Sequence, residues 1–183
     1  QAYGEDTVDV LENSPAQLSA IKGITTERAL AIGKEFRRIT GLRKAMTFFS
    51  KYGIQPVYIA AAWKQYEGAT VKIVSENPYC LCANGIELPF RDADRMALDL
   101  GVPPDSEERI YAGILWVLRT GASNGSTCLP EPLLSERVCS ALSVSEGSYY
   151  NALKMTEERG EIVIDGRDEG RFVFLSDLYG AER

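Results

Sequence analysis

Apolar residues recur every three or four positions through most of the first 120 residues, a spacing typical of amphipathic helices. The pattern first becomes regular after Ser14. Ser14 is predicted to cap a short helix that has Pro15 at its first position, and Gln17 is placed to complete a capping box. Lys22-Gly23-Ile24 then interrupts the pattern, so the first helix is expected to end there.

A second helix is predicted to begin at Thr25, which is placed as its cap. Four of its residues fall on one face at helical spacing: Ala29, Ile32, Gly33 and Phe36. Gly41 is predicted to end this helix region. A third helix is then expected over 42–51, and a fourth from Pro56 after the turn Tyr52-Gly53-Ile54.

Further helices are predicted over about 69–76, from Phe90 to Leu100, and from the acidic start Asp105 to Glu108 up to Gly121. Asp92, Asp94 and Asp99 on the middle one neighbour Arg91 and Arg95, so a solvated helix face is expected.

The last third of the chain has a different pattern. A polar loop over 123–126 precedes helices expected over about 131–142 and 146–159. Strands are predicted over 161–165 and 171–175, with Asp165-Gly166 and Glu169-Gly170 bracketing the turn between them. This order of elements, helices followed by a β-hairpin, is typical of a winged helix.

The most specific local pattern is the turn Ile21-Lys22-Gly23-Ile24, followed by Ala29. A helix-hairpin-helix motif has this form, because glycine lets the chain turn tightly and lets a phosphate approach backbone N–H groups. The start of the next helix adds partial positive charge at the same place. Tyr52-Gly53-Ile54 repeats the layout more loosely. The alternative for each turn is an ordinary helical hairpin with a glycine C-cap.

Charge separates the chain into two parts, although the whole carries a formal net charge of -6. Residues 22–72 hold ten basic residues against three acidic ones, a net of +7. Residues 81–183 hold ten basic against 18 acidic, a net of -8. An anionic partner is therefore expected at the N-terminal part, and the alternative is a solvated basic surface.

Several classes of site are excluded by what the sequence lacks. There is no His, which removes His-based catalytic triads and His metal ligands. No apolar run approaches 18 residues, so no membrane partner is expected. No phosphate-binding loop of the P-loop type occurs, and the carboxylates form no cluster suited to a nuclease. The cysteines Cys80, Cys82, Cys128 and Cys139 lack zinc spacing, so buried free thiols and a cytoplasmic location are expected.

The fold class predicted is mainly α, with tandem helix-hairpin-helix units over 1–104 followed by a winged-helix-like unit with a small β-hairpin over 105–183. The residues expected to bind DNA phosphates lie in and beside the first two turns. They are Lys22, Gly23, Thr25, Arg28, Lys51, Gly53 and Gln55. Residues 131–183 hold six basic residues against 11 acidic, so the second unit is expected to pack against protein.

The chain resembles the N-terminal, pre-motor region of bacterial RecD-like ATP-dependent DNA helicases, related to the exodeoxyribonuclease V alpha subunit. The resemblance covers nearly the whole chain. Its matching stretches are LSAIKGITTERALAI (18–32), FFSKYGI (48–54), VSENPYCL (74–81), FRDADRMALDLGVPPDSEERIYAGILWVL (90–118) and SNGSTCLP (123–130).

The resemblance implies helix-hairpin-helix units that bind single-stranded or junction DNA beside a motor that moves 5′ to 3′. It implies a role in DNA repair or recombination, with no catalysis by this region. A start at Gln1 instead of Met suggests a piece of a longer protein, and the motor, with its ATP and Mg²⁺, is expected after Arg183. Intramolecular contact with that motor is implied.

Two positions depart from the family pattern. The family has a Gly-Ile-Gly hairpin before Phe90, where this chain has Glu87-Leu88-Pro89, which argues against phosphate contact by the third unit. The family's Gly-His-Thr is Gly125-Ser126-Thr127 here, so any role of that His is lost. An alternative function is a protein-docking module in which the hairpins are merely structural.

Overall fold

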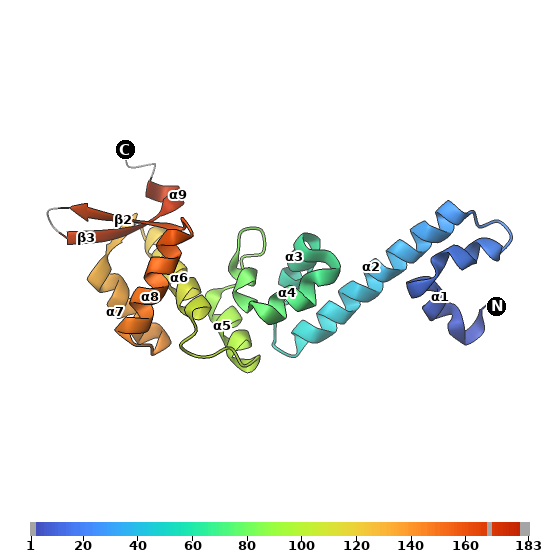
Figure 1. The fold of residues 1–183 in the computed structure, drawn as a ribbon, viewed down its shortest axis with the longest axis horizontal. Helices are drawn as coiled ribbons and strands as arrows, with labels where there is room; N and C mark the ends of the chain where they lie inside the picture. The colour runs from blue at the N-terminus through green and yellow to red at the C-terminus, as the bar shows by residue number, and fades with distance from the viewer. Residues whose placement is uncertain (1–2, 168–169, 180–183) are drawn as a thin grey trace. The chain divides into compact units, whose positions relative to one another are not determined.

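The computed structural model describes residues 3–167 and 170–179, which form two compact units, 1–74 and 75–183. The fold is mainly α with a small antiparallel sheet, as predicted (Figure 1). The boundary expected at 104/105 falls inside the second unit. Glu169, expected at the turn of the β-hairpin, lies outside the described residues.

The first unit is built around one long helix, α2, which runs from Thr26 to Ser50. Short helices precede it, and α3 and its neighbours follow it. The elements of this unit are η1 (Gly4–Asp6), α1 (Thr7–Asn13), η2 (Pro15–Ala20), α2 (Thr26–Ser50), α3 (Pro56–Tyr66), η3 (Glu67–Ala69) and α4 (Thr70–Glu76), which ends beyond the division.

Gly41 does not end a helix, contrary to the prediction. The helices expected on either side of it are one 25-residue helix, seen as the long light-blue ribbon in Figure 1. A Cβ at Gly41 would lie 2.5 Å from the Cη2 atom of Trp63. Gly41 is thus a place where α3 approaches α2 closely, because the Trp63 indole from α3 occupies the space that a side chain would need.

The start of the first predicted helix also differs from expectation. The segment after Ser14 is the 3₁₀ helix η2, and the Ser14 side chain makes no capping hydrogen bond. The preceding helix α1 was not predicted; its Val10 forms a small buried cluster with Leu18 and Ala29. This cluster attaches α1 and η2 to the beginning of α2.

The second unit contains the remaining helices and the sheet. Its elements are η4 (Pro78–Cys82), α5 (Phe90–Asp99), α6 (Glu107–Ser123), β1 (Cys128–Pro130), α7 (Glu131–Leu142), α8 (Glu146–Glu158), β2 (Ile162–Arg167), β3 (Gly170–Leu175) and α9 (Ser176–Tyr179). The predicted β-hairpin is present as β2 and β3. Strand β1, which is only three residues long, was not predicted.

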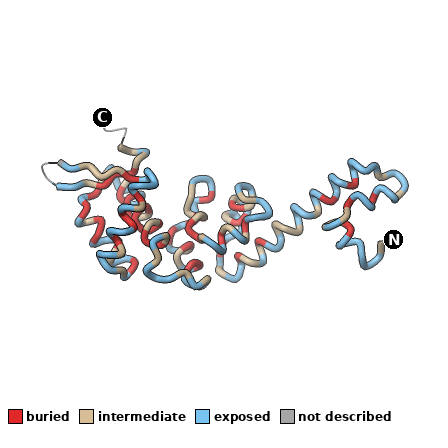
Figure 2. Tube along the Cα trace, in the orientation of Figure 1, coloured by how far each residue is buried: buried red, intermediate tan, exposed pale blue. Residues whose placement is uncertain are grey.

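Helix α6 lies at the centre of the second unit and buries residues along its whole length, as the red positions in Figure 2 show. It packs against α5, α7, α8 and the sheet. The strand order is β1-β3-β2, and Val173 in the central strand pairs with Leu129 on one side and Ile164 on the other. The helices and the sheet therefore share one core that includes Ile114, Leu134 and Tyr149.

All four cysteines are partly buried, and no disulfide joins them in the described part of the chain. Burial raises the pKa of the Cys82 thiol to about 12, so this thiol stays protonated at neutral pH. Among residues 3–167 and 170–179, no helix is both long and apolar enough to cross a membrane.

We predict that Gly41→Ala lowers the free energy of unfolding of the first unit by about 1 to 3 kcal/mol, since the Trp63 ring must move to admit the new methyl group. Urea unfolding followed by circular dichroism measures this change. Gly68→Ala is the matched control, because an added Cβ there meets no atom within 4 Å, and it is expected to change stability by less than about 0.5 kcal/mol. Equal costs for the two variants would contradict the close packing of α3 on α2.

Candidate nucleic-acid interface

The first predicted turn has the backbone geometry that glycine permits. Gly23 has a φ of +93°, and the Ile24 amide donates to the Ile21 carbonyl at 3.1 Å to close the turn. An added Cβ at Gly23 would meet no atom within 4 Å, so backbone conformation and not crowding requires glycine here. Lys22 and Gly23 are both exposed.

The turn leads directly into the beginning of α2. The Thr25 side chain accepts a hydrogen bond from the Arg28 amide at 3.2 Å, which confirms Thr25 as the cap. The first amides of a helix, here those of Thr26 and Glu27, have no acceptor within it, and the neighbouring Arg28 is exposed. The Glu27 carboxylate is the opposing charge in this first helical turn.

The second predicted turn ends α2 and begins α3. Gly53 has a φ of +70°, and the Ile54 amide donates to the Phe49 carbonyl at 3.4 Å. This is a Schellman C-cap, the geometry of an ordinary glycine-capped hairpin. Lys51 and Gln55 on either side are exposed, and the Gln55 side chain makes no capping hydrogen bond to α3.

The structure brings the seven predicted residues together in two groups, not one. Lys22, Gly23, Thr25 and Arg28 lie at the start of α2, whereas Lys51, Gly53 and Gln55 lie at its end. A helix of 25 residues is about 37 Å long at 1.5 Å per residue. A DNA strand that contacts both groups must therefore span about 37 Å.

Glycine caps alone do not identify a phosphate site in this chain. Gly101, Gly125 and Gly160 also follow helices with positive φ, and in each case the next amide donates back to the last helical turn. The turn after Gly101 continues into Pro103, Pro104 and Asp105, which offers no cation. Arg159, which precedes Gly160, is already bound by Glu108 at 2.6 and 3.1 Å. The turns at Gly23 and Gly53 instead have an exposed lysine, Lys22 or Lys51, one or two residues before the glycine.

The third turn, between η4 and α5, has a strained backbone. Gly85 has a φ of +88°, and Glu87 has a φ of +58°, in the left-handed region that side chains disfavour. The Leu88 amide nevertheless donates to the Leu81 carbonyl at 2.9 Å and Leu88 is buried, so packing holds the turn in place. Glu87 thus occupies a conformation better suited to glycine.

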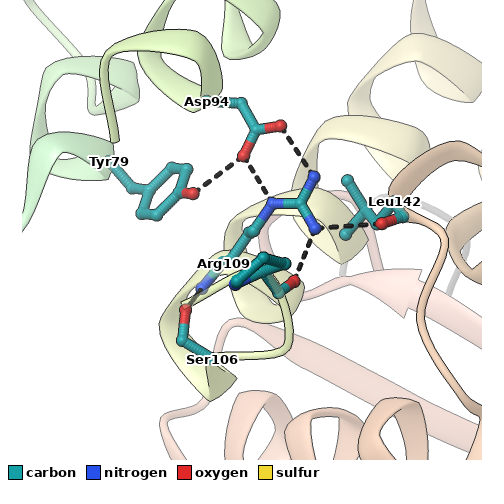
Figure 3. Close-up of polar contacts among 6 residues, drawn as sticks. Tyr79, Asp94, Ser106, Arg109 and Leu142 are labelled. Atoms are coloured by element: carbon teal, nitrogen blue, oxygen red, sulfur yellow. Dashed lines mark hydrogen bonds and ion pairs between the residues drawn. The ribbon is translucent and has the colours of Figure 1, made fainter. Parts of the chain in front are cut away.

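A buried ion pair holds the second unit around the turn between α5 and α6 (Figure 3). The Arg109 guanidinium donates to both Asp94 carboxylate oxygens, at 2.8 and 3.0 Å. It also donates to the Pro104 carbonyl at 2.5 Å and to the Leu142 carbonyl at 3.0 Å. The Tyr79 hydroxyl donates to Asp94 at 2.8 Å, so five segments of the chain meet at this pair.

The solvated face predicted for the three aspartates is therefore wrong for Asp94, whose side chain is only 15% exposed. Hydrogen bonds to Asp94 raise the pKa of Arg109 above its ordinary value, and burial raises the pKa of Tyr79. Both groups are therefore protonated at neutral pH. Asp92 fits the predicted solvated face better, because its side chain is 41% exposed and forms an ion pair with Arg95.

Comparison with known protein families agrees with the pattern of turns. Residues 38–128 match the family described as the ATP-dependent RecD2 DNA helicase HHH domain. The chain therefore carries the helix-hairpin-helix domain of RecD2-like helicases, as the resemblance implied. The match includes the turn at Gly53 and those at Gly85 and Gly101, whereas the turn at Gly23 precedes it.

The Asp94–Arg109 pair was not predicted, although the sequence contains a signal for it. Asp94 falls four residues after Phe90 and three before Ala97, both of which are buried, so it lies on the apolar face of α5. An acid at such a position needs a partner, and Arg109 also lies on the apolar face of its helix beside Ile110.

We predict that Asp94→Asn lowers the free energy of unfolding of the second unit by about 3 kcal/mol or more, because it leaves the Arg109 charge buried without a counter-ion. Urea unfolding followed by fluorescence in a Trp63→Phe background, where Trp116 on α6 is the one tryptophan, measures the loss. Asp92→Asn is the matched control on the same helix and is expected to cost less than about 0.5 kcal/mol. Similar losses for the two variants would refute this role of Asp94.

We predict that Glu87→Gly stabilises the second unit by about 1 kcal/mol, since glycine adopts a positive φ without the steric cost that Glu87 bears. Gly85→Ala places a methyl group on a neighbouring residue with positive φ and is expected to destabilise by about the same amount. Denaturant midpoints of the two variants provide the comparison. A lower midpoint for Glu87→Gly would show that the carboxylate stabilises the turn.

Proposed function

We propose that this chain is a DNA-binding accessory region of an ATP-dependent helicase that moves 5′ to 3′ and acts in DNA repair or recombination. Helix-hairpin-helix domains generally bind DNA, and the match to the RecD2 domain supports DNA as the partner. The observation that carries the proposal is the presence of two positive-φ glycine turns, each with an exposed lysine, at the two ends of one helix.

The proposed contact is to phosphates and not to bases. Backbone N–H groups at the Gly23 and Gly53 turns, together with Lys22, Arg28 and Lys51, offer donors and positive charge to a phosphate. Such contacts carry no base information, so binding is expected without sequence preference on single-stranded or junction DNA. At 3.4 Å per nucleotide in a stacked strand, the length of α2 corresponds to about 11 nucleotides.

The remainder of the proposed enzyme is a motor that binds ATP and Mg²⁺ and supplies the catalysis. We propose that the acidic second unit contacts this motor within the same protein, because its charge disfavours DNA. Residues 131–183 carry six basic residues against 11 acidic. The order α6, β1, α7, α8, β2, β3 supports the winged-helix interpretation of this unit. A DNA partner, and cysteines that form no disulfide among the described residues, support a cytoplasmic location.

A salt titration of binding to a fluorescein-labelled 20-nucleotide single strand tests the proposal. If about four phosphates are neutralised, the log–log slope of affinity against salt should lie near -3, from about -0.7 per phosphate. Lys22→Glu/Lys51→Glu is expected to reduce the magnitude of this slope by about 1.4 and to weaken binding about tenfold or more at 0.1 M salt.

Arg43→Glu/Lys72→Glu is the matched control, because it reverses two exposed charges of the same basic segment away from both turns. It is expected to weaken binding by less than about threefold. A slope indistinguishable from zero would refute the phosphate contact. Equal effects of the two double variants would favour the protein-docking alternative, in which the hairpins are structural.

A further inference from the structure

A groove in the first unit lies between the middle of α2 and the helices that follow it. It encloses about 1100 Å³ and is lined by α2 from Ala31 to Phe48, by Ala60 to Lys64 of α3, and by residues of η3 and α4. The lining residues of α2 span about 26 Å along the helix. We call this feature the α2–α3 groove. It does not include any residue of the Gly23 or Gly53 turns.

The edges of the α2–α3 groove are basic. Five basic side chains line it, against two acidic ones, Glu35 and Glu67: Lys34, Arg37, Arg38, Lys44 and Lys64. Glu35 is already bound by Arg38, at 2.6 and 2.9 Å, and Lys44 lies 3.6 Å from Glu12. Within the described part of the chain, Lys34 and Lys64 have no carboxylate partner. These two lysines are therefore available to an anionic ligand.

The apolar part of the groove contains aromatic rings. Phe48 of α2 and Trp63 of α3 are half-buried lining residues, beside Leu42 and Gly41. Because Gly41 has no side chain, the edge of the indole rests on α2, which fixes the ring in the groove. A fixed, partly exposed ring provides a surface on which a flat ligand can stack.

The middle of α2 contributes no buried residue to the core of the first unit. From Lys34 to Lys44 no residue of the helix is buried, and the stretch between the two ends of α2 is pale blue or tan in Figure 2. The buried positions Ala29, Gly33, Ala45 and Phe49 lie toward the ends of the helix. Apart from the face at Gly41 that meets Trp63 of α3, this basic helix segment is largely exposed and is suited to contact with a polyanion.

We infer that the α2–α3 groove binds single-stranded nucleic acid, with bases stacked on Trp63 and Phe48 and phosphates beside Lys34 and Lys64. Charged grooves that follow the backbone and aromatic rings that stack on bases are the two features of sites for single strands. An acidic protein segment would match the charge but would leave the rings without flat partners. Duplex DNA keeps its bases stacked within the helix and cannot offer them to the rings.

This site is separate from the phosphate contacts proposed at the two turns, and it does not require them. The turns bind phosphate without regard to the base, whereas the groove distinguishes a strand that has bases from one that has none. The two proposals can therefore fail independently. An abasic strand, which keeps every phosphate and lacks every base, separates the contributions.

The experiment uses the chain of residues 1–183 with Trp116→Phe, which leaves Trp63 as its one tryptophan. Oligo(dT) of 20 nucleotides and an abasic 20-mer are titrated in parallel, with Trp63 fluorescence and the anisotropy of a strand-attached fluorescein as separate measurements. Oligo(dT) is expected to quench Trp63 and to bind at least about fivefold more tightly than the abasic strand. Anisotropy with unsubstituted Trp116 verifies that the background substitution leaves affinity unchanged.

Lys34→Ala/Lys64→Ala is expected to weaken oligo(dT) binding about tenfold, since two phosphate contacts are lost. Arg43→Ala/Lys72→Ala removes the same charge outside the groove and is expected to weaken binding by less than about threefold. Retention of Trp63 quenching in Lys22→Glu/Lys51→Glu would support the groove independently of the turns. Equal affinity for oligo(dT) and the abasic strand without quenching would overturn the inference. Quenching by a 20-residue polyglutamate as strong as that by oligo(dT) would overturn it too, in favour of an acidic protein ligand.

Discussion

The second unit depends on one buried positive charge. Arg109 is 6% exposed, and burying a guanidinium without a counter-ion costs several kcal/mol. The unit satisfies it with the Asp94 carboxylate and with two backbone carbonyls, those of Pro104 and Leu142. These acceptors belong to three segments: Asp94 to α5, Pro104 to the turn after it, and Leu142 to the end of α7. Each segment must therefore lie where its oxygen reaches Arg109 in α6. The pair therefore specifies geometry more than it adds net stability.

The same pair explains why the chain does not divide after residue 104. The two helices on either side of that position are joined by the Asp94–Arg109 ion pair and by the stacking of Phe90 on Trp116, with ring centroids 4.9 Å apart. Separating them would expose a charge and an aromatic pair at once. Both helices lie within the unit 75–183. Three turns of the family-matched domain are thus distributed over both units, at Gly53 in the first and at Gly85 and Gly101 in the second.

Features encoded within a few neighbouring residues could be predicted from the sequence. Features that depend on a partner far away in the sequence could not. The cap at Thr25 and the helix from Glu131 to Leu142 were predicted because caps, turns and helical periodicity are encoded within a few residues. Gly41 was misinterpreted, because glycine makes room there for the indole of Trp63, which lies 22 residues away in another helix. Asp94 was misinterpreted for the same reason, because its partner lies 15 residues later.

The candidate site also combines features that a short stretch of sequence encodes with features that only the fold creates. The turns at Gly23 and Gly53 were recognisable because each is a short segment, although their placement at opposite ends of one helix was not. The α2–α3 groove exists only when α3 folds back on α2, so no window of sequence contains it.

The charge distribution then limits where a nucleic acid can lie in the proposed function. The basic segment 22–72 falls wholly in the first unit, and the acidic segment 81–183 wholly in the second. At physiological ionic strength charges interact over about 8 Å, so the acidic unit repels a strand only where the strand comes that close. Repulsion of this range does not prevent binding at α2. In the proposed function the strand therefore binds to the first unit, and the second unit is proposed to contact protein.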